Sequence, residues 1–448
     1  MDNWIFEQIA LQGEQVAVIF NDKEYSYEQL FDAIHQNYLQ LQENNVAQGS
    51  IVAIISDYNF DSIALFFALY RNNNIIVPVT TKMESEIQDR LLVANCDYAI
   101  EIRDNHLQIG KREVTNGCHS LITQLQEARK AGLILFSSGS TGAPKAMIHN
   151  LNNLIDSYKN RKGKKLVFLI FLMFDHIGGL NTMLNCVASG ITMVFPSDRN
   201  PDLVCRLIEK YKVNVLPASP TFLNLILISE SHLKYDLSYL RMITYGTEPM
   251  PDSLLYKLKE IFVKVKFLQT FGTSETGITS TSSKSSDSTY LKIDDPNTDY
   301  KIVDDELWIR SKTQILGYLN SSMERFTEDG WFKTGDLVEQ IEEGYMKIIG
   351  RNKELINVGG EKVLPSEVES VLFQMPDIKD CIVFGESNSI TGQIVVAKVL
   401  FNSDIKPSEA KKRIVAFCSD KLDRYKVPVK AILMAKSEFS DRFKKKRL

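Results

Sequence analysis

The sequence predicts an α/β protein with a large N-terminal domain of parallel-type βαβ sheets and a small α+β domain at its C-terminal end. The chain has 448 residues, of which 44% are hydrophobic and 24% charged, so it is long enough for two to four globular domains. Short apolar runs alternate with segments of helical spacing up to about residue 268. After Gly344 the pattern changes to shorter strand-like and helix-like segments.

The first apolar runs have the length of buried strands. They lie at residues 16–20, 51–55 and 75–79, and residues 61–70 between the second and third carry bulky apolar side chains at helical spacing. Strands that alternate with helices in this way are typical of βαβ units and of a mostly parallel sheet.

The same alternation returns after Gly132, and one segment then breaks it. Strands are expected at residues 133–136, 166–174 and 191–195, and helices at residues 181–188 and 201–211. Residues 279–300 are rich in Ser, Thr, Asp and Lys and contain few apolar residues. We therefore expect a long surface loop or a partly ordered insertion there.

The C-terminal part begins with two short strands, expected at residues 345–349 and 355–358. A charged turn at residues 351–354 separates them, and a helix is expected to begin near Pro365. The turn is where we expect the domain boundary. The predicted domains are residues 1–350 and 351–448.

Charge and composition exclude several classes of protein. The 52 Lys and Arg against 56 Asp and Glu give a net charge of −4, which provides no general reason to expect a nucleic-acid partner. The longest apolar run, residues 166–174, would rise only ~13 Å as a helix, whereas a membrane core is ~30 Å thick. No signal peptide is visible, and the Cys and His residues lack metal-ligand spacing. We expect a cytoplasmic protein without a membrane span.

A loop rich in glycine and hydroxyl groups follows the expected strand at residues 133–136. Residues 137–145 read SSGSTGAPK. Glycines let backbone N–H groups converge on an anion, and the hydroxyls and Lys145 add donors and charge, so the loop is suited to phosphate, although it could also be a flexible turn. It is not a Walker A loop, because Ala143 and Pro144 precede the lysine and Ala146 follows it.

A second motif lies at residues 269–275, which read QTFGTSE. Phe271 followed by Gly272 offers a flat face to a purine and room for it to approach. The hydroxyl of Ser274 can bind a phosphate oxygen, and the carboxylate of Glu275 is a hard ligand suited to Mg²⁺. Taken alone, the segment could equally be a strand end that enters a polar loop.

Three further segments follow in order along the chain. Residues 331–337 read WFKTGDL, residues 349–362 read IGRNKELINVGGEK, and the tail at residues 442–447 reads RFKKKR. Together with the two motifs above, they resemble the motifs of the AMP-forming adenylating superfamily, which comprises acyl- and aryl-CoA ligases, amino-acid adenylation domains and luciferases. The chain departs from the family pattern at Ala146 and Phe443, where glycine is usual.

The resemblance implies a role for each matched residue. Lys353 would be the hinge between the domains, and Gly359 and Gly360 would line the tunnel for the incoming thiol. Lys444 would contact the carboxylate and the α-phosphate, although the adjoining lysines leave this assignment open by one residue. The expected catalytic residues are Lys145, Glu275 and Lys444, and the expected ATP-binding residues are Ser138, Gly139, Ser140, Thr141, Gly142, Lys145, Phe271, Gly272, Ser274, Asp336 and Arg351.

The resemblance also implies a fold and a reaction. The N-terminal domain would include a β-barrel-like subdomain, and the C-terminal domain would be mobile. A carboxylate would attack ATP to give an acyl-adenylate and pyrophosphate, with Mg²⁺ on Glu275. The acyl group would then pass to coenzyme A, or to the phosphopantetheine of an acyl carrier protein, with release of AMP. A catalytically inactive ligand-binding relative is the alternative from another class.

The identity of the acid is expected to depend on residues 171–180. His176 is typical of relatives that act on fatty or aryl acids, whereas Asp175 after a phenylalanine imitates the pair that binds the substrate ammonium in amino-acid adenylation domains. The glycine pair that follows favours a plain carboxylic acid, with a stand-alone amino-acid adenylating enzyme as the alternative. Gly246 and Thr247 are expected to complete the acid pocket.

Overall fold

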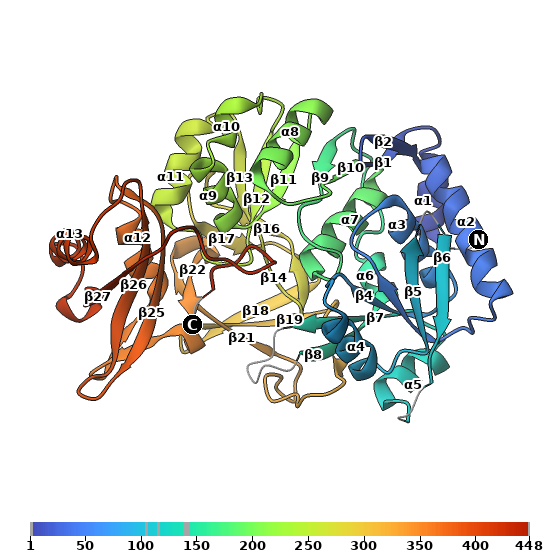
Figure 1. Ribbon diagram of the computed structural model, residues 1–448. Coiled ribbons are helices and arrows are strands. Elements are labelled where there is room, and N and C mark those ends of the chain that lie inside the picture. Colours follow the sequence, from blue (N-terminus) through green and yellow to red (C-terminus); the bar gives the residue numbers. More distant parts are fainter. Residues whose placement is uncertain (1–2, 104–105, 114–116, 138–143, 447–448) are drawn as a thin grey trace.

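The computed structural model describes residues 3–103, 106–113, 117–137 and 144–446. It has a large mixed α/β N-terminal domain and a smaller C-terminal domain, which begins at strand β23 and lies beside the N-terminal domain (Figure 1). The predicted fold class is therefore confirmed. Among the described residues, no helix is both long enough and apolar enough to cross a membrane.

Two seven-stranded sheets form the core of the N-terminal domain: the first is mixed parallel and antiparallel, and the second is parallel except for one edge strand. The first has the order β20-β8-β7-β4-β3-β5-β6, and the second has the order β13-β12-β11-β9-β10-β1-β2. The strands of the first sheet are β3 (Ile51–Ile55), β4 (Ile75–Val79), β5 (Tyr98–Arg103), β6 (His106–Lys111), β7 (Gly132–Ser137), β8 (Lys145–Asn150) and β20 (Gly317–Tyr318). Those of the second are β1 (Val16–Phe20), β2 (Lys23–Ser26), β9 (Val167–Leu169), β10 (Thr192–Phe195), β11 (Val215–Ala218), β12 (Met242–Tyr245) and β13 (Lys266–Gln269).

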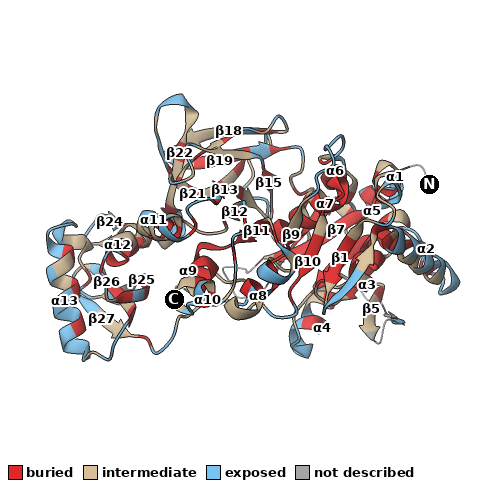
Figure 2. Cartoon of the chain, turned by 90° about the horizontal axis from the view of Figure 1, so that it is seen from above, coloured by how far each residue is buried: buried red, intermediate tan, exposed pale blue. Residues whose placement is uncertain are grey.

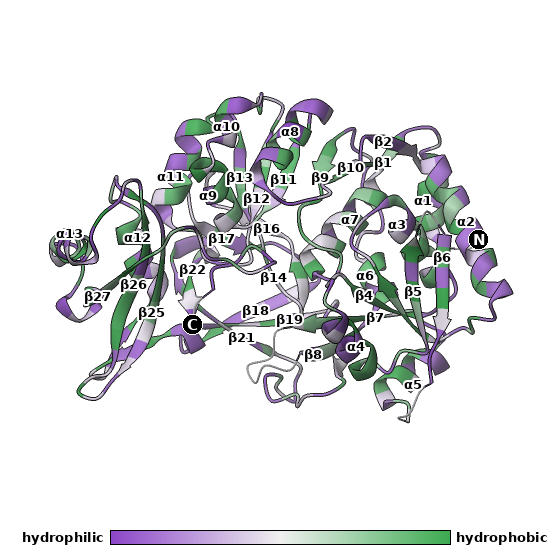
Figure 3. Ribbon diagram, viewed as in Figure 1, coloured by the Kyte–Doolittle hydropathy of each residue, from purple (hydrophilic) through white to green (hydrophobic). Residues whose placement is uncertain are grey.

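Helices cover both sheets, and one hydrophobic cluster spans the two sheets. Helix α3 is apolar on nearly all sides and contacts both β1 and β3, so it lies between the two sheets. Figures 2 and 3 show buried, apolar strands inside and polar helix faces outside. The helices of this domain are α1 (Trp4–Leu11), α2 (Tyr27–Glu43), α3 (Phe60–Arg71), α4 (Glu84–Val93), α5 (Ser120–Glu127), α6 (Leu151–Asp156), α7 (Ile177–Ser189), α8 (Pro201–Tyr211), α9 (Pro220–Ile228), α10 (Ser231–Lys234) and α11 (Asp252–Ile261).

The strand expected at residues 166–174 is too long in the prediction. Only β9 is extended there, and the following residues form a loop that leads to the N-cap of α7 at His176. The loop residues are apolar because they pack into the core: Phe171 contacts Phe222, and Phe174 contacts Tyr58. Burial, and not strand pairing, explains this apolar run.

The prediction of a loop or insertion at residues 279–300 is wrong. This region contributes strands to a six-stranded antiparallel sheet with the order β16-β17-β22-β21-β19-β18. Leu291 and Ile293 are buried at alternate positions of β17, which is all that a half-exposed antiparallel strand requires. The strands of this part are β14 (Phe271–Thr273), β15 (Gly277–Thr279), β16 (Thr281–Ser283), β17 (Tyr290–Ile293), β18 (Thr298–Val303), β19 (Glu306–Ser311), β21 (Phe332–Gln340) and β22 (Met346–Arg351), with the 3₁₀ turn η1 (Glu342–Gly344) before β22.

The C-terminal domain is a five-stranded sheet with two helices. The chain leaves the six-stranded sheet at the end of β22, passes through the turn η2 (Asn352–Glu354) and enters the new sheet at β23. Its elements are β23 (Ile356–Val358), β24 (Glu361–Val363), α12 (Pro365–Leu372), β25 (Ile378–Asn388), β26 (Gly392–Phe401), α13 (Pro407–Ser419), η3 (Arg424–Lys426) and β27 (Lys430–Leu433). It has its own hydrophobic core.

The glycine pair at the start of α7 has a packing role. A Cβ on Gly179 would lie 2.3 Å from the carbonyl oxygen of Met173 and 2.8 Å from that of Leu172. We expect Gly179→Ala to lower the free energy of unfolding by about 1–3 kcal/mol, because this overlap with backbone outweighs a gain in helix propensity of about 1 kcal/mol. Urea denaturation measures the change.

The matched control is Gly117→Ala, because a Cβ at Gly117 would meet no atom within 4 Å. Its expected effect is within about 0.5 kcal/mol. Equal stability of the Gly179→Ala variant and the native chain would contradict the packing role.

Candidate active site

A cavity of about 240 Å³ lies where several strands of the N-terminal domain end and the C-terminal tail returns. The carboxyl ends of parallel strands β11 and β12 supply part of its wall, which is the usual place for a ligand in an open α/β sheet. Segments far apart in the sequence therefore meet here. The predicted residues that line it are His176, Gly246, Thr247, Phe271, Gly272, Ser274, Glu275, Arg351, Lys353 and Lys444.

The cavity wall is strongly cationic. Among the described lining residues, Glu275 is the one carboxylate. The same cavity is lined by five cationic residues: Arg325, Arg351, Lys353, Arg442 and Lys444. Such an excess of positive charge in a concave site attracts a polyanion.

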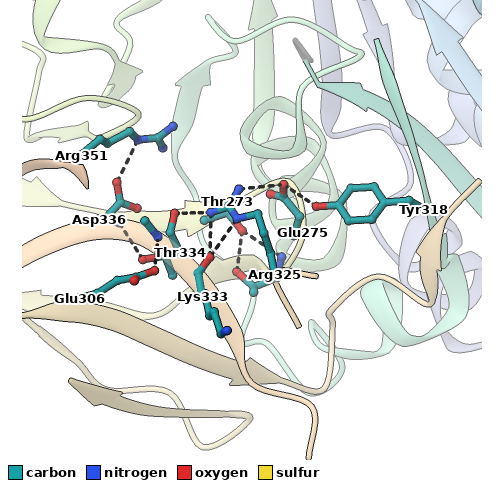
Figure 4. A network of polar contacts seen from close by, with 11 residues as sticks. Thr273, Glu275, Glu306, Tyr318, Arg325, Lys333, Thr334, Asp336 and Arg351 are labelled. Carbon is teal, nitrogen blue, oxygen red and sulfur yellow. Dashed lines mark hydrogen bonds and ion pairs between the residues drawn. The ribbon is translucent and has the colours of Figure 1, made fainter. Parts of the chain in front are cut away.

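The buried Asp336 and the partly exposed Arg351 form an ion pair beside the cavity (Figure 4). The Nε atom of Arg351 donates to Oδ1 of Asp336 over 2.9 Å. Burial raises the pKa of the Asp336 carboxyl, and Arg351 opposes that rise, while Asp336 raises the pKa of Arg351. Arg351 lines the cavity, and its partner Asp336 is next to that wall without being one of the lining residues.

A turn in β21 explains why threonine and glycine precede Asp336. The amide of Asp336 donates to the hydroxyl of Thr334 over 3.0 Å, and the amide of Gly335 donates to Glu306 over 2.7 Å. Gly335 has a φ of 73°, a left-handed conformation that glycine adopts without strain. This local turn holds the carboxylate in its position.

Glu275 is suited to binding a metal ion together with a ligand. The residue lines the cavity and is 8% exposed, and its carboxylate accepts a hydrogen bond of 3.0 Å from the hydroxyl of Tyr318. The guanidinium of Arg325 lies 3.9 Å away. Mg²⁺ is commonly held by one or two carboxylates together with substrate phosphates, so this donor set fits it. Within the described residues, no group of three or more acidic, His or Cys side chains could hold a metal without such a ligand.

The tail places two neighbouring lysines in different surroundings. Lys444 lines the cavity, and burial, followed by the nearby Arg351, lowers its pKa to about 8. The ammonium of Lys445 instead lies 2.8 Å from Glu369 in the C-terminal domain. Of these two residues, Lys444 is therefore the one whose side chain reaches the cavity.

The chain is similar to known proteins in both sequence and structure. Residues 5–319 match the family described as AMP-binding enzyme, and residues 367–440 match the AMP-binding enzyme C-terminal domain. The chain belongs to the AMP-binding enzyme family. The predicted resemblance is thereby confirmed.

Similar proteins cover nearly the whole of this AMP-binding enzyme. An indoleacetate–CoA ligase of Aromatoleum aromaticum is 25% identical over 97% of this chain and 94% of its own length. A 2-succinylbenzoate–CoA ligase of Listeria monocytogenes is 24% identical over 97% and 96%. A crystal structure of an anthranilate CoA ligase with anthranoyl-AMP has a TM-score of 0.81 at 20% identity, covering 98% of this chain and 94% of that one.

Asp175 does not line the cavity of this AMP-binding enzyme. It is 4% exposed and accepts hydrogen bonds from two guanidinium groups, that of Arg90 at 2.9 Å and that of Arg442 at 3.3 Å. The aspartate that imitates an ammonium-binding group is thus occupied by the protein's own cations. His176, the next residue in the sequence, does line the cavity.

His176 faces the cavity as a neutral hydrogen-bond donor. Its Nδ1 accepts a bond of 3.0 Å from the amide of Gly178 at the start of α7, so the neutral ring carries its proton on Nε2. Burial lowers the pKa of His176 well below its usual value, and Lys444 and Arg442 add to this effect.

Lys145, Gly359 and Gly360 do not line the cavity. Lys145 begins β8, and its ammonium lies 5.8 Å from the centre of the Tyr318 ring. Gly359 and Gly360 form the exposed turn between β23 and β24. The predicted phosphate-loop residues Ser138, Gly139, Ser140, Thr141 and Gly142 lie outside the described residues.

Two arginines that line the cavity were not predicted from the sequence. Arg325 precedes the tryptophan motif without any spacing that marks it, and its guanidinium also donates to backbone carbonyls of Lys333 and Thr334. Arg442 stands at the start of the basic tail, where the dense charge concealed its individual role.

Proposed function

We propose that this AMP-binding enzyme is an ATP-dependent carboxylic acid–thiol ligase. A carboxylate oxygen attacks the α-phosphorus of ATP, the bond to the leaving pyrophosphate breaks, and an acyl-adenylate forms. A thiol then attacks the acyl carbon, AMP leaves with its bonding electron pair, and the thiol proton passes to solvent. The observation that carries the proposal is the single cavity that brings Glu275, Arg351 and Lys444 together.

The first half-reaction joins two anions, so the cavity must offset their repulsion. Asp336 and Arg351 would hold the ribose, and the aromatic face of Phe271 would receive the adenine. Glu275 would hold Mg²⁺, which neutralises phosphate charge when it is bound. The ammonium of Lys444 would stabilise the charge that develops between the carboxylate and the α-phosphate.

The second half-reaction requires a different arrangement of the C-terminal domain. In the structure Lys444 occupies the cavity while the turn at Gly359 and Gly360 is exposed to solvent. This arrangement supports adenylation. For the thiol to reach the adenylate past that glycine turn, the C-terminal domain would rotate about Lys353, which follows the last strand of the N-terminal sheet.

A plain carboxylic acid is the substrate class that we favour over an amino acid. Asp175 does not line the cavity, and its Oδ2 binds two guanidinium groups of the protein, so it is not placed to receive a substrate ammonium. The neutral His176 can donate a hydrogen bond to the acid. Similar proteins are named as ligases of indoleacetate and 2-succinylbenzoate with coenzyme A, which supports an aryl acid and free coenzyme A. A carrier-protein phosphopantetheine is the alternative acceptor.

A panel of acids tests the substrate class and the acceptor. The enzyme is incubated with ATP, Mg²⁺ and coenzyme A and with aryl, fatty or amino acids in turn, and the products are identified by mass spectrometry. We expect an acyl-CoA together with AMP and pyrophosphate for a non-amino acid. Thioester formation on a carrier protein alone would favour the alternative acceptor, and products limited to amino acids would contradict the preference for a plain acid.

The pKa of Lys444 predicts a pH dependence for adenylate formation. The group is cationic below its pKa of about 8 and loses its charge above it. Because the cation is required, kcat/KM should fall about tenfold per pH unit above pH 8. The Lys444→Arg variant keeps its charge to above pH 12, so its residual kcat/KM should not fall in this range. The same decline in both proteins would assign the pH dependence to another group.

A further inference from the structure

The C-terminal tail forms a compact hairpin at its entry into the cavity. The amide of Ser440 donates to the carbonyl of Lys444 over 2.8 Å, and the amide of Phe443 donates to the carbonyl of Ser440 over 2.8 Å. Figure 1 shows this part of the chain running back from the C-terminal domain to the middle of the molecule. Because the hairpin is tightly bonded, whatever holds its neighbouring residues also fixes the position of Lys444.

An ion pair holds the hairpin to the N-terminal domain. Arg442 donates from one Nη atom to Oδ2 of Asp175 over 3.3 Å and to the carbonyl oxygen of Phe136 over 3.4 Å. Asp175 is almost fully buried and is already bound to Arg90 of α4. A buried carboxylate with one fixed guanidinium is a prepared acceptor for a second cation.

An aromatic contact holds the next residue. The ring of Phe443 lies 5.0 Å from that of Phe171 and 5.3 Å from that of Phe222, between centroids, and it stacks on Phe439 at 5.1 Å. Its carbonyl accepts a hydrogen bond of 2.6 Å from Ser219. The φ of Phe443 is 51°, a left-handed conformation that a residue with a side chain keeps only when its surroundings impose it.

We propose that Asp175 is the docking site of the C-terminal tail and that, by binding Arg442, it positions Lys444 in the cavity for the first half-reaction. Asp175 and Arg442 are positioning residues in this account, with Phe443 as a second anchor. The inference rests on the proposed function for its effect on rate, but not for the docking itself. It also assigns a role to an aspartate that otherwise resembles a substrate-binding group.

Docking should affect the two half-reactions unequally. The Arg442–Asp175 contact joins the tail to the N-terminal domain, so it stabilises the arrangement with Lys444 in the cavity. The ion pair of Lys445 with Glu369 is formed within the C-terminal domain, so it would be kept when that domain rotates. Loss of the Arg442 contact therefore weakens only the adenylating arrangement.

The test compares Arg442→Gln, Asp175→Asn and the double variant in both half-reactions. We expect Arg442→Gln to slow ATP–pyrophosphate exchange about tenfold, in line with the loss of a charged hydrogen bond, and to leave thioester formation from supplied acyl-adenylate unchanged. The double variant should be no slower than the slower single variant, because both remove the same contact. Three results would overturn the proposal: additive losses of rate in the double variant, equal losses of rate in both half-reactions, or an unchanged rate of ATP–pyrophosphate exchange.

A control and a second readout keep docking separate from activity. Lys430→Gln removes an exposed cation that pairs with Glu386 within the C-terminal domain, and it should change neither half-reaction. Hydrogen exchange of the Phe443 and Lys444 amides, measured without substrates, should be faster in Arg442→Gln than in the native chain. Unchanged exchange of these amides would refute docking even if the proposed function failed, and Arg442→Gln tests it even if Asp175→Asn did not fold.

Discussion

Replacement of Lys444 by alanine is expected to slow adenylate formation by about 10²–10³-fold while leaving thioester formation from supplied acyl-adenylate nearly unchanged. The ammonium of Lys444 lines the cavity in the arrangement that we assign to adenylation. A charge placed where negative charge develops lowers the barrier of that step alone. ATP–pyrophosphate exchange reports the first half-reaction, and release of AMP from synthetic acyl-adenylate and coenzyme A reports the second.

Two neighbouring lysines provide the controls for this result. Lys446→Ala removes an exposed cation two residues further on and should leave both half-reactions intact. Lys445→Ala breaks the pair with Glu369 and should not reproduce the selective loss. Equal loss of both half-reactions in Lys444→Ala, or a selective loss in Lys445→Ala, would contradict the role given to Lys444.

The second large effect concerns Asp336. We expect Asp336→Ala to raise the KM for ATP by about 10–100-fold, since hydrogen bonds to a charged group contribute about 1.5–3 kcal/mol. Removal of Asp336 also leaves Arg351 without its 2.9 Å partner. The sharper measurement compares ATP with 2′,3′-dideoxy-ATP. The native enzyme should strongly prefer ATP, and the variant should lose this preference because the acceptor for the ribose hydroxyls is gone.

The matched control is Asp299→Ala, which breaks an exposed Asp–Arg pair with Arg310 at the same distance of 2.9 Å. It should leave both the KM for ATP and the preference for ATP unchanged. Asp336→Asn keeps the shape of the side chain and separates the loss of charge from any loss of stability. Retained preference for ATP over the dideoxy analogue in Asp336→Ala would show that another group reads the ribose.

Buried elements were predictable from the sequence where one local rule decides them. Strands β1, β3 and β4 are short apolar runs that lie inside the sheets, and helix α8 begins at a proline after an asparagine cap. The apolar residues after β9 look like strand but are buried in a loop, and β17 looks like loop because only alternate residues need be apolar. In both cases tertiary packing decides whether the segment is a strand or a loop, and a short stretch of sequence carries no information about that packing.

The site divides in the same way. Each motif is local, so its cavity residues, such as Glu275 and Arg351, could be predicted from the sequence. The sequence does not show which lysine of the tail enters the cavity, because tertiary contacts such as that of Phe443 with Phe222 decide this. Asp175 was predicted to bind the acid, whereas its partner Arg442 is 267 positions away in the sequence. No periodicity links residues at that separation.

We infer that the cationic cavity activates a carboxylic acid by adenylation. The decisive measurement is carboxylate-dependent exchange of radiolabelled pyrophosphate into ATP, without coenzyme A and over a broad panel of acids. We expect exchange that requires Mg²⁺ and at least one acid and that is lost in Lys444→Ala. No exchange with any acid of the panel, at enzyme concentrations where ATP is bound, would contradict it and favour an inactive ligand-binding relative.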